Sequence, residues 1–310
     1  MPNYKQYKEV KKELIRKYKR RKLSRENAEM DAFISINDFL SKSKSQGPLA
    51  ESGLIDYHYQ SYENIAFYIS ILIFEIGYQR IMCMPEYILK YDTLIVKNTI
   101  LYIESNDEII VPLNFKKEIE LCSNARFIYT TFIITRTTDV KQLSHANMLI
   151  IDLFKKTIER YEPFGKSIPG DTYKSNFAFS KKIDERIKKV ISYLNLNFTY
   201  ISPIDMAPIK GLQSIADAYD GMCITYSLMY LQLRIMNPDI NQSDIIKYFS
   251  EKSKVKLRNI ILRYAKYIEE KLKENPEAIN AKKYQLYNVE YGKNYNYVVS
   301  GPRGEFEANY

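Results

Sequence analysis

Tryptophan is absent from this chain of 310 residues, which contains only two histidines and three cysteines. The cysteines, Cys83, Cys122 and Cys223, lie far apart and lack the C-x-x-C spacing of a zinc site. The same spacing argues against a disulfide framework. We therefore interpret Cys83 and Cys122 as packing residues, expect at least one free thiol, and predict neither a metal nor a cofactor.

The sequence also lacks a hydrophobic run long enough to cross a bilayer. The best candidate, residues 65–74, is followed by Glu75 and is well short of the roughly 18 residues required. The N-terminus carries positive charges without a following apolar segment, so it is not a secretory signal. We expect an intracellular protein in a reducing compartment, without a membrane span.

Charge is distributed unevenly along the chain. The net charge is +9, and residues 1–25 account for all of it, so the remainder is neutral. This predicts a basic helical N-terminal arm over residues 1–40, which can bind nucleic acid, an acidic partner or a membrane surface, or can simply be solvated. The candidate nucleic-acid-binding residues are Lys17, Lys19, Arg20, Arg21 and Lys22.

After the arm, the periodicity predicts a main domain over residues 41–277 and a loosely ordered, Tyr- and Gly-rich tail over residues 278–310. Short β-branched runs predict strands, whereas apolar spacing of three and four predicts helices. The predicted strands cover residues 92–98, 99–105, 107–113, 127–136, 145–153, 157–163 and 197–204. The predicted helices cover residues 61–82, 180–196, 222–236 and 243–273.

His145 begins one strand of a predicted hairpin, and Glu162 ends its partner. Antiparallel pairing brings the start of the first strand beside the end of the second, so these two side chains should be neighbours. Asp152 is the rival carboxylate, but it lies near the far end of the hairpin, about 23 Å away along an extended strand. We therefore reject Asp152 as the partner of His145.

Cys223 opens the apolar helix predicted over residues 222–236. The N-terminus of a helix favours the thiolate, because its dipole and its exposed N–H groups stabilise negative charge. A cysteine nucleophile also needs a base and a third group that orients the base. His145 and Glu162 are the candidates for those roles; the alternative is that Cys223 is a small buried hydrophobic residue.

These residues carry a resemblance to a known family. The segment HANMLIIDLFKKTIERYE resembles the His-strand-turn-strand-acid block of the adenovirus-protease and SUMO-protease superfamily of cysteine peptidases, and DAYDGMCITYSL resembles its nucleophile segment. ERYEPFG and RIMNPD look like the versions in large cytoplasmic DNA viruses. The resemblance covers roughly residues 125–240. It implies an α+β, papain-like fold with a central mixed β-sheet packed on the nucleophile-bearing helix, and a location in the host cytoplasm or the virion.

The resemblance further implies acyl transfer, with Cys223 as nucleophile, His145 as base, Glu162 as its orienting group and Gln213 in the oxyanion hole. The implied substrate is a protein, either a ubiquitin-like modifier or a viral precursor, cut after a Gly-Gly-type site. Three positions depart from the family pattern. Ala146 replaces a tryptophan after the histidine, Asp217 occupies the usual glutamine position while Gln213 lies ten residues before Cys223, and Ile224 replaces a glycine.

Two other functions stay open at this point. The first is a catalytically inactive descendant that acts as a binding module, with the arm docking on nucleic acid or a virion component. The second is acetyl transfer, because bacterial effector acetyltransferases look like the same His-Glu-Cys order, although the sequence shows no acetyl-coenzyme A site. The other histidine, His58, is interpreted as structural, and residues 164–167, FGKS, lack the first glycine of a phosphate-binding loop.

Overall fold

The computed structural model describes the following residues: 81–84, 88–91, 94–97, 99–112, 114–137, 142–166, 173–216, 222–274, 297–300 and 306–309. The N-terminal arm with its five candidate nucleic-acid-binding residues lies outside this part of the chain, as do His58 and Asp217. The predicted helix over residues 61–82 lies outside it too, except at its end, where Met82–Cys83 form a short strand, β1, rather than helix.

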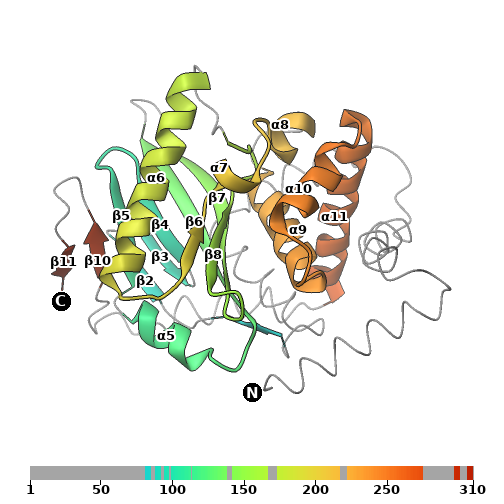
Figure 1. Cartoon of the computed structure of the whole chain (residues 1–310). Helices are drawn as coiled ribbons and strands as arrows, with labels where there is room; N and C mark the ends of the chain where they lie inside the picture. The colour runs from blue at the N-terminus through green and yellow to red at the C-terminus, as the bar shows by residue number, and fades with distance from the viewer. Residues whose placement is uncertain are drawn as a thin grey trace.

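The described residues form a mixed α+β fold, which confirms the predicted class at that level (Figure 1). Nine strands make one sheet in the order β11-β10-β5-β4-β6-β7-β8-β9, with β1 paired beside β6. Three pairs are parallel, β1 with β6, β4 with β6 and β8 with β9, and the others are antiparallel. The strands not yet bounded are β4 (Thr99–Ile103), β5 (Glu108–Pro112), β6 (Phe127–Thr137), β7 (Gln142–Asp152), β8 (Thr157–Tyr161), β9 (Thr199–Ile201), β10 (Tyr297–Ser300) and β11 (Phe306–Asn309).

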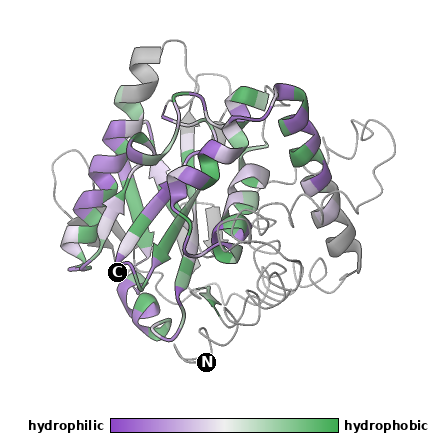
Figure 2. Cartoon of the chain, turned by 45° about the vertical axis from the view of Figure 1, so that its right-hand side comes forward, coloured by the Kyte–Doolittle hydropathy of each residue, from purple (hydrophilic) through white to green (hydrophobic). Residues whose placement is uncertain are grey.

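The central strands β6, β7 and β8 alternate their side chains between two hydrophobic cores. On β6, Phe127, Tyr129 and Ile133 face one core, and Ile128, Phe132 and Ile134 face the other. Both faces of the sheet are therefore covered, and the strands are apolar on both sides (Figure 2). The predicted hairpin is confirmed, because β7 pairs antiparallel with β8 in the register Met148–Tyr161 to Asp152–Thr157.

Helices cover the two faces of the sheet (Figure 1). The long helix α6 (Tyr173–Tyr193) lies across one face with α5 (Phe115–Leu121) near its end. On the other face, α9 (Cys223–Met236) packs against β7 and is itself surrounded by α8 (Leu212–Ala216), α10 (Gln242–Ser250) and α11 (Lys254–Glu274). Apart from Met236, every residue of α9 is buried, as the all-round apolar sequence predicted.

The far end of α9 is tied to the sheet by buried ion pairs. Arg234, near the end of α9, donates from Nε to Glu159 Oε1 on β8 at 3.0 Å. Beside it, Asp152 pairs with Arg126 at 3.2 Å, so this carboxylate belongs to the far end of the hairpin, as the sequence predicted. A stacked pair of tyrosine rings on β8 and α9, Tyr161 and Tyr230, lies 4.0 Å apart between centroids. These contacts fix α9 on β8 and thereby place its N-terminus, Cys223.

Several sequence predictions were wrong in detail. Residues 243–273 form two helices instead of one, because the chain turns at Glu251 and restarts at Ser253, whose hydroxyl accepts a hydrogen bond from the Lys256 N–H. The tail supplies β10 and β11, which extend the sheet beyond β5. Four further elements were not predicted: β2 (Ile88–Tyr91), α5, α7 (Pro203–Met206) and α8. The predicted strand over residues 92–98 corresponds to β3 (Leu94–Lys97), which pairs with β2 in a separate small sheet.

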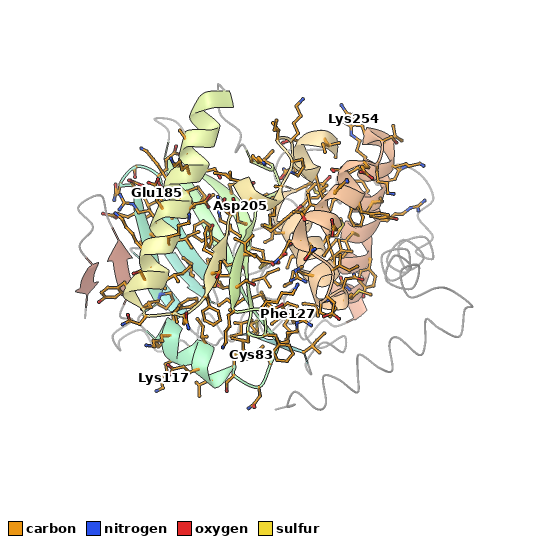
Figure 3. All side chains as sticks on the ribbon, viewed as in Figure 1. Cys83, Lys117, Phe127, Glu185, Asp205 and Lys254 are labelled. Carbon is orange, nitrogen blue, oxygen red and sulfur yellow. A yellow bond between two sulfur atoms is a disulfide. The ribbon has the colours of Figure 1, made fainter. Side chains whose placement is uncertain are left out.

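The interpretation of Cys83 and Cys122 as packing thiols was also wrong. They form a disulfide that joins β1 to the end of α5, with Cα atoms 5.6 Å apart (Cys83 is labelled in Figure 3). Sequence spacing could not reveal it, because the two cysteines are 39 residues apart and meet only through the pairing of β1 with β6. Cys223 is consequently the single free cysteine of the chain.

The helices of the described residues are too short or too polar to span a bilayer.

Candidate functional site

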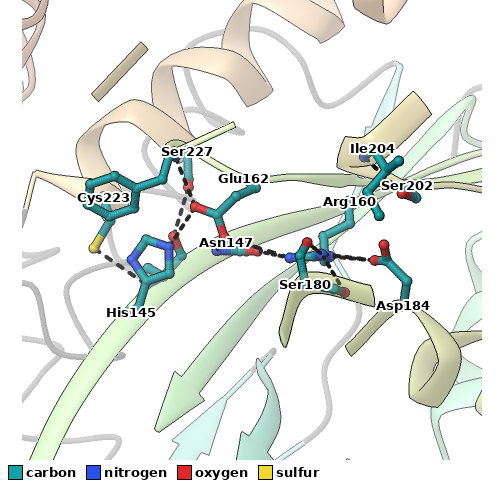
Figure 4. A network of polar contacts seen from close by, with 12 residues as sticks. His145, Asn147, Arg160, Glu162, Ser180, Asp184, Ser202, Ile204, Cys223 and Ser227 are labelled. Atoms are coloured by element: carbon teal, nitrogen blue, oxygen red, sulfur yellow. Dashed lines mark hydrogen bonds and ion pairs between the residues drawn. The ribbon is translucent and has the colours of Figure 1, made fainter. Parts of the chain in front are cut away.

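Three side chains that the sequence singled out meet at one point between the sheet and α9 (Figure 4). His145 lies on β7, Glu162 directly follows β8, and Cys223 is the first residue of α9. His145 Nε2 lies 2.7 Å from Glu162 Oε1, and the imidazole of His145 and the thiol of Cys223 lie close enough to shift each other's pKa. Because Nε2 is occupied by Glu162, the other ring nitrogen, Nδ1, is the one available to the sulfur.

The strand peptide at Ala146 also binds the nucleophile helix. The Ala146 N–H donates to Cys223 Sγ at 3.4 Å, and the Ser227 hydroxyl, one helical turn after Cys223, donates to the Ala146 carbonyl at 3.3 Å. The Ala146 side chain is buried in the same core cluster as Cys223. A small residue after His145 therefore allows α9 to lie directly on β7, which accounts physically for alanine at this position.

The electrostatics of the site favour a charged pair. Burial by itself disfavours imidazolium, but the charge of Glu162 and hydrogen bonds with Cys223 and Glu162 raise the pKa of His145 to about 10. Burial likewise opposes the thiolate of Cys223, but the hydrogen bond and charge of His145, with the Ala146 N–H, lower its pKa below the usual value. These interactions therefore favour the charged form of the Cys223–His145 pair, thiolate with imidazolium, over the neutral form.

Glu162 is fully buried and has donors at both carboxylate oxygens. Oε1 accepts from His145 and from the Phe164 N–H at 2.9 Å, while Oε2 accepts from Asn147 Nδ2 at 2.9 Å. Although burial raises the pKa of Glu162, the charge and hydrogen bond of His145, the charge of Arg160 and the Phe164 N–H together lower it. Glu162 is thus a fixed anion behind the imidazole.

Sequence reasoning missed two contributors to this arrangement. The Phe164 ring packs against the His145 ring with centroids 5.0 Å apart, so an aromatic side chain lies against the imidazole. Asn147 follows His145 by two positions, which places both side chains on the same face of β7. That alternation was the available signal for Asn147, but a buried strand amide is not by itself diagnostic of a site.

Two turns around Glu162 and Gln213 are locked together by glycines. The Gly211 N–H donates to the Phe164 carbonyl at 2.7 Å, and the Gln213 N–H donates to the Pro163 carbonyl at 3.0 Å. A Cβ on Gly211 would lie 2.2 Å from the nitrogen of Gly165, whose φ is +91°. Hydrogen atoms at both glycines permit this approach, which fixes the start of α8 beside the turn that carries Glu162.

Gln213 therefore lies close in space to the Glu162 turn, although ten residues separate it from Cys223 in the chain. Its side chain is buried, and its Oε1 has no hydrogen-bond partner among the described residues. Ile224, where the family pattern has glycine, is buried inside α9. Within the described ranges, no group of three or more His, Cys, Asp or Glu side chains is arranged to hold a metal ion.

Comparison with known proteins adds one relative. The chain is 26% identical over 179 residues to a putative ankyrin repeat protein of Acanthamoeba polyphaga mimivirus, an alignment that covers 52% of this chain. The chain accounts for only 23% of the length of that protein. Ankyrin repeats recur about every 33 residues as helix pairs, and this sequence shows no such period. No family model matches the chain.

Proposed function

We propose that this chain is a cysteine peptidase that cleaves a peptide or isopeptide bond through Cys223, His145 and Glu162. The observation that carries the proposal is the convergence of the one free cysteine, at the start of a buried helix, with an imidazole that is hydrogen-bonded to a buried carboxylate. A packed structural cysteine needs no imidazolium beside it. The fold assigned with this proposal is papain-like, of the adenovirus-protease and SUMO-protease type.

The proposed reaction begins with attack of the Cys223 thiolate on the carbonyl carbon of the scissile bond. The charge that develops on the carbonyl oxygen is stabilised by the N-terminus of α9, through the Cys223 N–H, and by the Gln213 amide. His145 gives its proton to the leaving amine while Glu162 holds the ring in place. Water, deprotonated by His145, then hydrolyses the thioester, which releases the acid product and restores the Cys223 thiolate beside protonated His145.

The proposed substrate is a ubiquitin-like modifier or a viral precursor protein, cut after a Gly-Gly-type site, in the host cytoplasm or the virion. The support for a viral setting is the resemblance of ERYEPFG and RIMNPD to versions in large DNA viruses, together with the mimivirus relative. The basic arm, with Lys17, Lys19, Arg20, Arg21 and Lys22, is proposed to bind nucleic acid.

The alternative is a catalytically inactive binding module with the same fold. It is favoured by Ala146 and Ile224, which replace two residues of the family pattern, and by the burial of Cys223, whose exposed fraction is only 6%. Cleavage assays separate the two functions, because a binding module retains the charged pair without turnover. A panel of ubiquitin-like modifiers with fluorogenic C-terminal amides is the direct assay.

Alkylation by iodoacetamide tests the charged pair without knowledge of the substrate. We expect one equivalent to react at Cys223 near neutral pH, and the rate to fall at least about tenfold in His145→Ala, since one unit of thiol pKa changes the thiolate fraction by that factor. His58→Ala, which removes the only other histidine, is the matched control and should react like the wild type. A His145→Ala variant that reacts as fast as the wild type would refute the proposed pair.

A further inference from the structure

Glu162 can orient His145 only if the carboxylate is itself held in place. A hydrogen bond to its second oxygen, Oε2, does this. Asn147 Nδ2 donates to Glu162 Oε2 at 2.9 Å, and Asn147 is fully buried. The Asn147 side chain comes from β7, two residues after His145, so the acid and the base that it orients are both secured by one strand (Figure 4).

The orientation of the Asn147 amide is fixed by chemistry as well as by packing. Arg160 Nη1 donates to Asn147 Oδ1 at 2.7 Å. A guanidinium can only donate and an ionised carboxylate can only accept, so the amide oxygen must face Arg160 and the amide nitrogen must face Glu162. Reversing the amide would place a donor against a donor and an acceptor against an acceptor.

Arg160 is in turn anchored to α6. Its Nε and Nη2 donate to Asp184 at 3.1 Å and 2.8 Å, and Nη2 also donates to the Ser180 hydroxyl at 2.8 Å. Tyr200 on β9 donates to the same Asp184 oxygen at 2.7 Å. A continuous buried path of hydrogen bonds therefore runs from α6 through Arg160 and Asn147 to Glu162.

We propose that Asn147 is a positioning residue for the reaction, and that Arg160, braced by Asp184 of α6, sets the Asn147 amide so that it holds Glu162 against His145. This inference rests on the proposed peptidase function. Arg160 also lies 3.7 Å from Glu162 Oε2, too far for a direct hydrogen bond, so Asn147 is the group that transmits its position. The Asn147 side chain bonds Glu162 and Arg160, so it acts on His145 through Glu162.

The pH dependence of Cys223 alkylation tests the proposal. The charged groups around the Cys223–His145 pair are Glu162 after β8, Arg160 on β8 and, behind them, Asp184 on α6. In Asn147→Leu the branched shape of the side chain is kept and the donor is lost, so Glu162 is free to turn away from His145. We expect the acid limb of the profile to move about one unit to higher pH, with an alkylation rate about tenfold lower at pH 6. The limiting rate at alkaline pH should not change.

The matched control is the same substitution at Asn237, another buried asparagine whose side chain bonds the Leu233 carbonyl at the opposite end of α9. Asn237→Leu should leave the profile in place. If Asn147→Leu fails to fold, Asn147→Ala removes the same donor without adding volume and should show the same shift.

The possible outcomes are distinct. An Asn147→Leu profile that superimposes on the wild type overturns the positioning role, and so does an equal shift in Asn147→Leu and Asn237→Leu. Both results leave the proposed function intact as long as the wild-type acid limb lies below that of an ordinary thiol. A wild-type Cys223 that titrates as an ordinary thiol instead overturns the proposed function itself, whatever the asparagine variants do.

Discussion

Replacing Glu162 by glutamine removes one negative charge from the site while keeping the size of the side chain. The His145–Glu162 hydrogen bond is 2.7 Å long, and the Glu162 side chain has no exposed surface. A hydrogen bond of this charged kind contributes about 1.5–3 kcal/mol, which corresponds to roughly one to two pKa units. We therefore expect the pKa of His145 to fall by about this amount in Glu162→Gln, which weakens the interaction by which His145 lowers the pKa of Cys223.

The substitution should also destabilise the fold, because glutamine has only one acceptor oxygen. The carboxylate accepts from His145 and the Phe164 N–H at one oxygen and from Asn147 at the other. Whichever way the glutamine amide is placed, its NH₂ group meets a donor. The expected loss in the free energy of unfolding is about 1–3 kcal/mol.

Two measurements check these numbers, iodoacetamide alkylation of Cys223 across pH 5 to 10, followed by intact mass, and urea denaturation. Glu159→Gln is the matched control: Glu159 lies on β8, three residues before Glu162, is equally buried, and is bound by Arg234, Tyr230 and Gln242 at the far end of α9. It should lose similar or greater stability without moving the alkylation profile. An unchanged profile in Glu162→Gln would refute the assignment of Glu162 as the orienting acid.

Two further expectations follow from the same structure. The pKa of Glu162 is lowered, so the stability that Glu162 contributes is present above its unfolded pKa near 4.5 and is lost as the pH falls, whereas the stability that His145 contributes is present below pH 6.5 and is lost as the pH rises through about 10. The difference in unfolding free energy between wild type and His145→Ala should therefore be largest between pH 4.5 and 6.5. A difference that does not change with pH would contradict the pairing. Replacing both Cys83 and Cys122 by alanine opens a loop of 39 residues and should lower the unfolding free energy by about 3–4 kcal/mol. The alkylation profile of Cys223 should not change. A double variant as stable in urea as the wild type would argue against the disulfide.

The parts of the site that could be predicted from sequence are those set by local rules. Two apolar, β-branched runs joined by a short turn specify an antiparallel hairpin, which placed Glu162 beside His145 and set Asp152 apart. Apolar residues all round the segment specify a buried helix, which placed Cys223 at its first residue. Each of these inferences depends on neighbours within a few residues of the chain, or on one hairpin.

The parts that could not be predicted depend on contacts between distant segments. The disulfide requires β1 to pair with β6, and the hold on Glu162 requires α6 to bring Asp184 against Arg160. The tail strands, β10 and β11, have only four residues each within a polar tail, and β10 joins the sheet by pairing with the edge that β5 offers. Contacts between distant segments leave no periodic pattern in the sequence from which they could be predicted.

The close approach of Gly165 and Gly211 has a consequence for anyone who redesigns this protein. A side chain at either glycine would overlap the backbone at the other, so neither position can be substituted on its own. The loop after β8 and the loop before α8 therefore have to be exchanged together. Loop grafts around Gln213 should therefore carry both segments, or retain glycine at both places.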